Sequence, residues 1–124
     1  MLANVIGDDG PDGKKARREI LSARDLAAPD LVDVETVAVL RKRWLAGTLT
    51  TRRFSAAVSD LEAIAVDRYA TLPLLRRVYE LRANVTAYDA VYVALAEALG
   101  CELLTGDAKL ANTPGPRCAV RVLR

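Results

Sequence analysis

Three carboxylate residues stand where a lone negative charge is costly. When the helix expected over 31–45 is placed on a helical wheel, Glu35 falls within an apolar arc formed by Leu31, Val32, Val34, Ala38, Val39 and Leu45. Asp89 lies in the first turn of a helix over 86–99 that is apolar nearly all round. Asp107 follows a short apolar strand. On such an arc the Glu35 carboxylate must be paired or bound to a metal, because burying a lone carboxylate costs several kcal/mol.

Each of the three positions also has a structural interpretation. Glu35 could form a buried pair with an arginine. Thr86 and Asp89 resemble a capping box, in which the threonine caps the helix and the acid follows three residues later. Asp107 could cap a short helix predicted over 107–112.

Two further acids are set aside as site residues. Asp33 lies near the polar face of its helix, where a negative charge in the first turn is favourable. Glu97 lies two turns beyond Asp89, about 12 Å along the helix axis, so these two carboxylates cannot share a site.

The three candidates are expected at one rim of a parallel sheet. Sites in such sheets form beyond the carboxyl ends of the strands, where Asp107 lies beside Thr105 and Gly106. Glu35 and Asp89 occupy first helical turns, which face the same rim if each helix follows a strand. The chain has no histidine, so a cluster of carboxylates predicts a hard cation, Mg²⁺ or Mn²⁺. Such an ion would activate water and stabilise charge on a phosphate during in-line attack.

The elements that must position these residues form one α/β domain. The chain has 124 residues, of which 52% are hydrophobic and 27% charged, enough for one core. Helices alternate with short apolar strands, which indicates a mostly parallel sheet. We predict helices over 14–23, 30–46, 50–63, 71–84, 86–99 and 107–112, and strands over 64–70, 101–107 and 118–124.

Composition excludes several classes of protein. No apolar run approaches the ~20 residues of a membrane span, and we find no signal segment. Cys101 and Cys118 are too few for a disulfide scaffold, so we expect a cytoplasmic protein. The net charge is only +2, although most of the eighteen basic residues are arginine, which pairs well with phosphate. Solvated helix faces are the better explanation of any single arginine doublet, so the arginines are weak evidence for a nucleic-acid partner.

Two segments resemble the PIN-domain nucleases, specifically the VapC-type toxins of toxin–antitoxin systems. The first segment is APDLVDVETVAVLRKRWLAG, with Glu35 at the second acidic position of the family pattern. The second is RYATLPLLRRVYELRANVTAYDAVYVALAEALGCELLTGDAKLA. In it, Asp89 of TAYDA matches the third acid and Asp107 of LLTGD the fourth. The resemblance covers about residues 20–124, and the two later motifs together make it specific.

The resemblance implies a PIN-like three-layer α/β fold, with a mostly parallel central sheet flanked by helices. It implies a toxin that cleaves RNA with Mg²⁺, in which Glu35, Asp89 and Asp107 are the catalytic and metal-binding acids and Thr105 supports them. It also implies a homodimer and a cognate VapB-type antitoxin whose tail covers the acidic site.

One part of the family pattern has no counterpart in this chain. Family members open with a strand of the form VVDAS, whose aspartate is the first acid, whereas this chain opens with MLANVI. Asp8 and Asp9 lie in a Gly- and Pro-rich loop and are poor substitutes. We therefore expect a single PIN-like domain over 1–124 that lacks the usual first, central strand. A start codon assigned too late and a truncated, catalytically defective protein that only binds antitoxin both stay open.

Two other function classes fit less well. A phospho-acceptor receiver domain needs an acidic pair after its first strand and a lysine after its last, whereas Lys109 precedes the last strand. An arginine-rich RNA-binding module without catalysis needs aromatic side chains for base stacking. The few aromatic residues here lie mostly on apolar stripes, which is typical of core residues.

Overall fold

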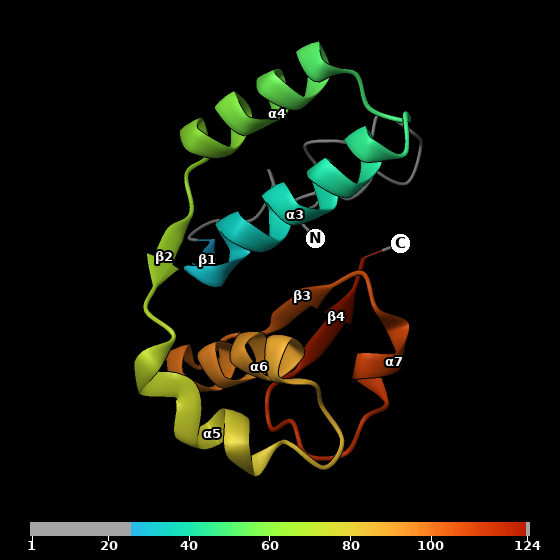
Figure 1. Cartoon of the computed structure of the whole chain (residues 1–124). Helices are drawn as coiled ribbons and strands as arrows, with labels where there is room; N and C mark the ends of the chain where they lie inside the picture. The colour runs from blue at the N-terminus through green and yellow to red at the C-terminus, as the bar shows by residue number, and fades with distance from the viewer. Residues whose placement is uncertain (1–25, 124) are drawn as a thin grey trace. The chain divides into compact units, whose positions relative to one another are not determined.

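The computed structural model describes residues 26–123, and these fall into two compact units (Figure 1). The first unit contains residues 26–27 and 31–67, and the second contains 28–30 and 68–123. The predicted helix over 14–23 and the loop with Asp8 and Asp9 lie outside the described residues. The elements are β1 (Ala27–Pro29), α3 (Leu31–Leu45), α4 (Thr51–Ala63), β2 (Asp67–Tyr69), η1 (Leu72–Leu74), α5 (Leu75–Glu80), α6 (Ala87–Leu99), β3 (Leu103–Thr105), α7 (Ala108–Ala111) and β4 (Val120–Val122).

The first unit is built on a hairpin of α3 and α4. The chain leaves α3 through Gly47, whose φ of +79° lies in the left-handed region that favours glycine. Thr50 caps α4, because its side chain accepts a hydrogen bond of 3.2 Å from the Arg53 N–H. These signals confirm the helices predicted over 30–46 and 50–63. A small buried cluster holds the hairpin together; it contains Leu40, Leu49 and Ala57, with Phe54 packed against it.

The strands β1 and β2 form a pair whose residues are divided between the two units. The Asp67 N–H donates to the Leu26 carbonyl at 2.9 Å, and the Asp30 N–H donates to the Tyr69 carbonyl at 2.8 Å. From the first bond to the second, the residue numbers increase on both strands, as they do in a parallel pair. We did not predict β1, since we assigned Pro29 to a helix start. In a paired strand, the backbone nitrogens of alternate residues point away from the partner strand. Proline is tolerated at such a position because its missing N–H costs no hydrogen bond to that partner.

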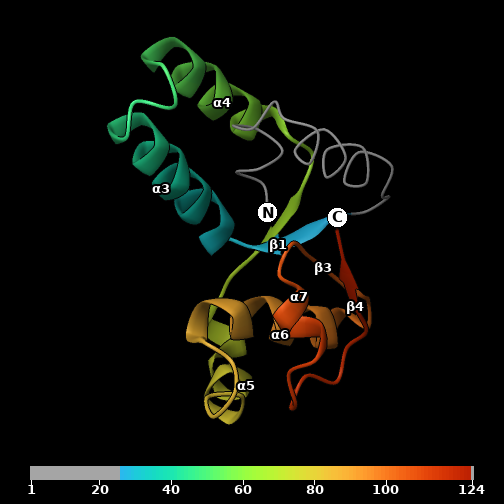
Figure 2. The same cartoon turned by 90° about the vertical axis from the view of Figure 1, so that its right-hand side faces the viewer.

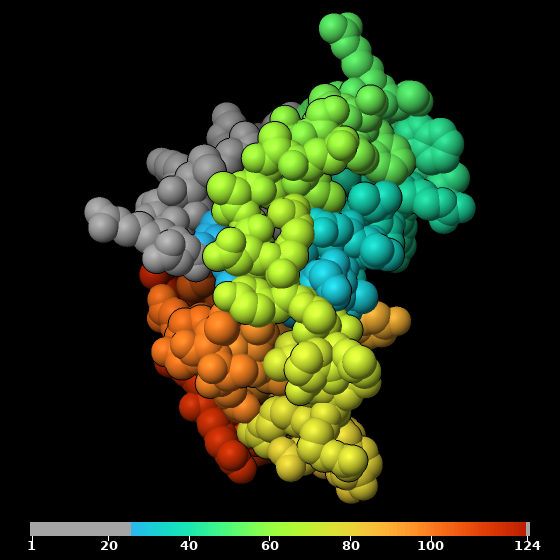
Figure 3. Space-filling view, turned by 90° about the vertical axis from the view of Figure 1, so that its left-hand side faces the viewer, coloured from blue at the N-terminus to red at the C-terminus, as the bar shows by residue number. Residues whose placement is uncertain are grey.

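The second unit places α6 between α5 and the parallel pair β3–β4. Leu103 pairs with Val120 and Thr105 with Val122 in this strand pair. The helix contacts α5 and β3, and Figure 2 shows β3, β4 and α7 grouped beside it. Figure 3 shows the same unit in atoms, with the orange α6–β3 region lying between α5 in yellow and the red C-terminal segment. The core of this unit contains Leu81, Val85, Ala90, Val93, Ala96, Leu103 and Leu110.

The four described strands form two pairs, β1–β2 and β3–β4, and one central sheet stays a prediction. The α/β class itself is confirmed. The absence of the family's first strand stays a prediction, because residues 1–25 lie outside the described part.

The apolar arc predicted for α3 is wrong. The buried residues of α3 are Val32, Thr36 and Leu40, whereas Val34 is 69% exposed and Leu45 59% exposed. The buried positions recur every four residues. They form a narrow stripe along the helix, as wide as the contact with a single packed element. Within residues 26–123, the helices are all too short or too polar to be membrane spans.

Candidate active site

Asp89 lies at the amino-terminal turn of the most deeply buried helix. Thr86 is the N-cap of α6, and its hydroxyl oxygen accepts a hydrogen bond of 3.2 Å from the Asp89 N–H. This confirms one half of the predicted capping box. The carboxylate is half-buried, and the amino-terminal end of a helix favours negative charge there. Among the described residues, no hydrogen bond or ion pair holds the Asp89 side chain, so its oxygens can accept an external ligand.

Asp107 lies directly beyond the carboxyl end of β3, as predicted. Its side chain caps α7 by accepting a 2.9 Å hydrogen bond from the Lys109 N–H through Oδ1. Its own N–H donates to Thr105 Oγ1 at 3.1 Å, so the threonine fixes the turn that carries the acid. The capping interpretation is confirmed, but one capping bond leaves further acceptor sites on a carboxylate. The Asp107 side chain is exposed and remains open to a ligand.

The chain topology directs Asp89 and Asp107 toward the same end of the second unit. β3 follows α6 after a reversal at Gly100, where φ is +65°, and Figure 1 shows the two elements running in opposite directions. From this reversal, the helix carries Asp89 back by about 16 Å. The extended segment carries Asp107 forward by about 23 Å in the same general direction. The carboxyl end of β3 therefore lies toward the amino-terminal end of α6.

Glu35 belongs to the first unit, whereas the two aspartates belong to the second, so its place in the acidic set stays a prediction. Glu35 and Asp33 are both half-buried, and both take part in interactions. The helical-wheel distinction between a core-facing Glu35 and a solvent-facing Asp33 is therefore wrong. Burial gives no reason to prefer one over the other, and the case for Glu35 depends on the matched motif.

Glu97 is the acid whose environment we missed. Arg77 donates to its two carboxylate oxygens, from Nε at 2.7 Å and from Nη2 at 3.1 Å, in a bidentate pair. The Arg117 N–H adds a third hydrogen bond of 2.7 Å, and Arg77 Nη2 also donates to the Gly115 carbonyl at 3.0 Å. This cluster joins α5, α6 and the segment before β4. An acid within an otherwise apolar helix was the signal that a basic partner must exist.

The cluster shifts the pKa of both partners in the directions that charge pairing requires. The hydrogen bonds from Arg77 lower the pKa of Glu97, and the Arg117 N–H acts in the same direction against the effect of burial. The carboxylate in turn raises the pKa of Arg77. Glu97 is therefore fully ionised and paired near neutral pH, which gives it a structural role.

The donor chemistry of Asp89, Asp107 and Thr105 suits a hard divalent cation. All three offer oxygen, which Mg²⁺ and Mn²⁺ prefer over nitrogen or sulfur. In neither unit, over residues 26–123, do three acidic, cysteine or histidine side chains gather closely enough to enclose a metal. The two aspartates would thus supply part of a shell, which water and further acids must complete. Mg²⁺ commonly keeps several waters in protein sites.

Comparison with known proteins identifies the family. The PIN domain model matches residues 2–116, a span that includes the segment before residue 20. A VapC ribonuclease from Mycobacterium bovis is 40% identical over 106 residues, which cover 86% of this chain and 84% of the relative. Ribonuclease VapC1 of Mycobacterium tuberculosis is 42% identical over 98 residues, covering 78% of this chain and 74% of that protein. Ribonuclease VapC12 of the same organism is 30% identical over 113 residues, covering 91% and 87%.

The PIN domain match extends over both units and includes the motifs that carry Glu35, Asp89 and Asp107. It agrees with the resemblance found in the sequence and with the α/β elements of the structure. The chain therefore belongs to the PIN-domain family and, within it, to the VapC-type toxins.

Proposed function

We propose that this protein is a Mg²⁺-dependent endoribonuclease and the toxin of a toxin–antitoxin module. The observation that supports this most strongly is the position of two acids in the second unit. Asp89 at the start of α6 and Asp107 beyond β3 are directed toward one end, and the relatives that match most of the chain are ribonucleases by name.

Each residue of the proposed site has a distinct part. Asp89 offers a half-buried carboxylate without a protein partner in the described part of the chain, at a helix end that stabilises its charge. Asp107 is oriented by the Lys109 N–H, and Thr105 holds the turn beneath it. We also assign Glu35 to the acidic set, on the basis of its place in the family motif. Mg²⁺, when held by these acids, supplies an activated water and neutralises charge that develops on the phosphate.

The proposed partners follow from the same family assignment. They are an RNA substrate, a VapB-type antitoxin and a second copy of this chain in a homodimer. Mn²⁺ would substitute for Mg²⁺ because both accept oxygen ligands in octahedral geometry. We place the reaction in the cytoplasm, in keeping with two unpaired cysteines.

The proposal is tested by cleavage of a mixed RNA pool with purified full chain, with Mg²⁺ and with a chelator in excess. We expect cleavage with Mg²⁺ and none with the chelator. Asp89→Asn, Asp107→Asn and Glu35→Gln should each reduce the rate, whereas Asp33→Asn should have little effect. Asp60→Asn on the exposed face of α4 is the matched control for loss of a carboxylate.

Two results would contradict the proposal in different ways. Cleavage that continues in the chelator would remove the metal from the mechanism. A chain that binds its antitoxin but leaves RNA intact would favour the alternative of a catalytically defective protein that retains antitoxin binding.

A further inference from the structure

Each of the two cysteines lies two residues before one of the neighbouring strands β3 and β4. The parallel register of β3 and β4 pairs Leu103 with Val120. If this register is extended two residues earlier, beyond the paired residues, it brings Cys101 opposite Cys118. Neighbouring strands lie about 4.8 Å apart, within the range of about 4.4–6.8 Å between Cα atoms that a disulfide requires.

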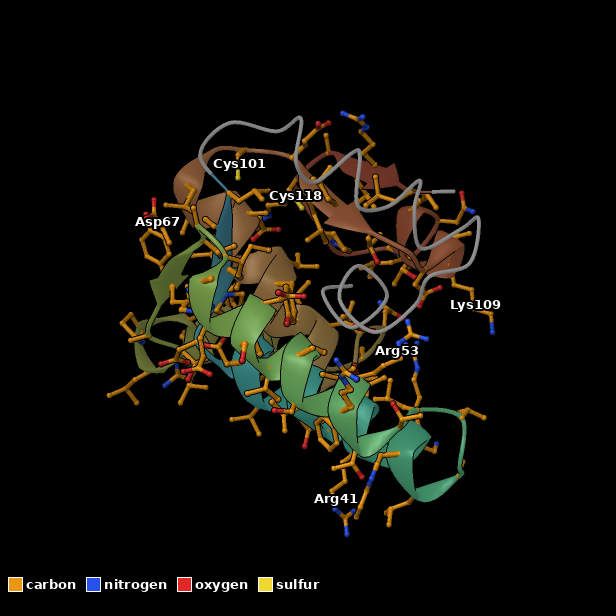
Figure 4. All side chains as sticks on the ribbon, turned by 90° about the horizontal axis from the view of Figure 1, so that it is seen from above. Arg41, Arg53, Asp67, Cys101, Lys109 and Cys118 are labelled. Atoms are coloured by element: carbon orange, nitrogen blue, oxygen red, sulfur yellow. The ribbon has the colours of Figure 1, made fainter. Side chains whose placement is uncertain are left out.

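Two hydrogen bonds attach these positions to the same turn of α6. The Cys101 N–H donates to the Ala96 carbonyl at 3.0 Å. The residue before Cys118 donates its N–H to the Glu97 carboxylate at 2.7 Å. Because Ala96 and Glu97 are consecutive, the backbone at both cysteines is held to one point of the helix. Figure 4 labels both side chains, and the charge of Cys101 is one of those that act on the Cys118 thiol.

The environments of the two thiols differ in a way that suits sequential reaction. Cys101 is exposed, whereas Cys118 is half-buried and packs against the core beside Val120. Burial raises the pKa of the Cys118 thiol, and the negative charge of Glu97 and the nearby Cys101 raise it further. Cys101 is therefore the thiol that an oxidant reaches first, and Cys118 is the thiol that follows.

We propose that Cys101 and Cys118 form a reversible dithiol–disulfide site that reacts with peroxides. The Cys101 thiolate attacks one peroxide oxygen, which forms a sulfenic acid as the O–O bond breaks and hydroxide leaves. The Cys118 thiolate then attacks Sγ of Cys101, so that the S–S bond forms as the S–O bond breaks. In total, the two thiols lose two electrons and two protons, and one hydrogen peroxide becomes two waters.

This site lies apart from the proposed active site. The cysteines precede β3 and β4, whereas Thr105 and Asp107 lie at the other end of β3. The closed loop would span residues 101–118 and contain β3 and α7. The proposal of a dithiol site can therefore fail while the proposed ribonuclease activity is confirmed, and the reverse is also true.

The test uses the full chain, reduced and then exposed to hydrogen peroxide, with remaining thiols alkylated by N-ethylmaleimide before mass spectrometry. We expect the loss of two hydrogen atoms, no alkylation, and full return of both thiols with dithiothreitol. Trypsin separates the cysteines, because Arg82, Lys109, Arg117 and Arg121 bound the peptides 83–109 and 118–121. A cross-link between these two peptides that is unaffected by dilution would support the proposal.

Cys101→Ser and Cys118→Ser are the matched controls. Neither variant can form the internal cross-link, and Cys101→Ser should lose its remaining thiol more slowly because Cys118 is half-buried. The proposal is overturned if both wild-type thiols stay open to alkylation after peroxide. It is equally overturned if each is oxidised separately, or if the cross-link joins two chains and disappears on dilution.

Discussion

The two acids of α6 differ in how the protein holds them. Glu97, near the carboxyl end of the helix, receives three hydrogen bonds from Arg77 and Arg117. Asp89, in the first turn, donates its backbone N–H to the hydroxyl of Thr86, which caps the helix. Its carboxylate has no hydrogen-bond partner among the described residues. Both carboxylates are half-buried. A half-buried acid with a basic partner stabilises the fold, whereas a half-buried acid without one indicates a site for a bound ligand.

The largest expected effect is on catalysis, at the amino-terminal end of the helix. Asp89→Asn keeps the size and the backbone cap but removes the charge that would hold the cation. We expect RNA cleavage to fall by roughly 100-fold or more, with the melting temperature nearly unchanged. Cleavage rates of the variant, wild type and Asp60→Asn measure this directly. Full activity in Asp89→Asn would end the distinction between the two acids.

The opposite pattern is expected at the other end. Glu97→Ala removes the acceptor for both Arg77 bonds and for the Arg117 N–H, so the free energy of unfolding should fall by about 2–3 kcal/mol. Urea denaturation measures this loss. Glu80→Gln is the matched control, because the Glu80 side chain is half-exposed and its ion pair with Arg77 is long, at 3.5 Å. This variant should lower the free energy of unfolding by less than about 1 kcal/mol. Equal losses of unfolding free energy in both variants would show that the cluster of Glu97, Arg77 and Arg117 does not stabilise the fold.

A smaller effect is expected when the cap beneath Asp89 is removed. Thr86→Ala should lower the free energy of unfolding by about 1 kcal/mol and also reduce cleavage, because the first turn that carries Asp89 would fray. Thr50→Ala removes the equivalent cap of α4 in the first unit and should cost similar stability without an effect on cleavage. If the two variants reduced cleavage equally, the effect of Thr86 would be one of general stability alone.

The smallest effect is the pH dependence of stability from Glu97. Its pKa in the folded protein lies below the value of the unfolded chain, because Arg77 and the Arg117 N–H stabilise the charged form. The stabilisation is therefore present above the unfolded pKa and is lost as the pH falls through the folded pKa. Glu97→Gln should flatten the acid limb of a plot of Tm against pH. An unchanged acid limb would mean that Glu97 does not contribute to it.

The boundaries of α4 and α6 could be predicted because their signals are local, whereas the helix predicted over 71–84 is a short η1 (Leu72–Leu74) followed by α5 (Leu75–Glu80). Thr86 and Gly100 bound α6 as predicted, and Thr50 caps α4. Capping residues act within one turn of themselves, so no distant part of the chain is needed to recognise them. Asp107 was likewise predicted correctly at a strand end, as a cap of the following helix.

Features that depend on distant partners could not be predicted. β1 is three residues long and exists because β2, about forty residues later, pairs with it. Arg77 and Glu97 are twenty residues apart, and the sequence does not show which of fourteen arginines would reach that acid. The buried stripe of α3 depends on where its neighbours pack, so the periodicity of apolar residues misassigned Val34 and Leu45.

The central claim is that Asp89 and Asp107 form part of one site for a divalent cation. The most direct test is binding of Mn²⁺, followed by its electron paramagnetic resonance signal, to wild type, Asp89→Asn, Asp107→Asn and the Asp60→Asn control. We expect saturable binding in wild type and the control, and affinity reduced by roughly tenfold or more in each site variant. Equal Mn²⁺ affinity in all four proteins would contradict the claim.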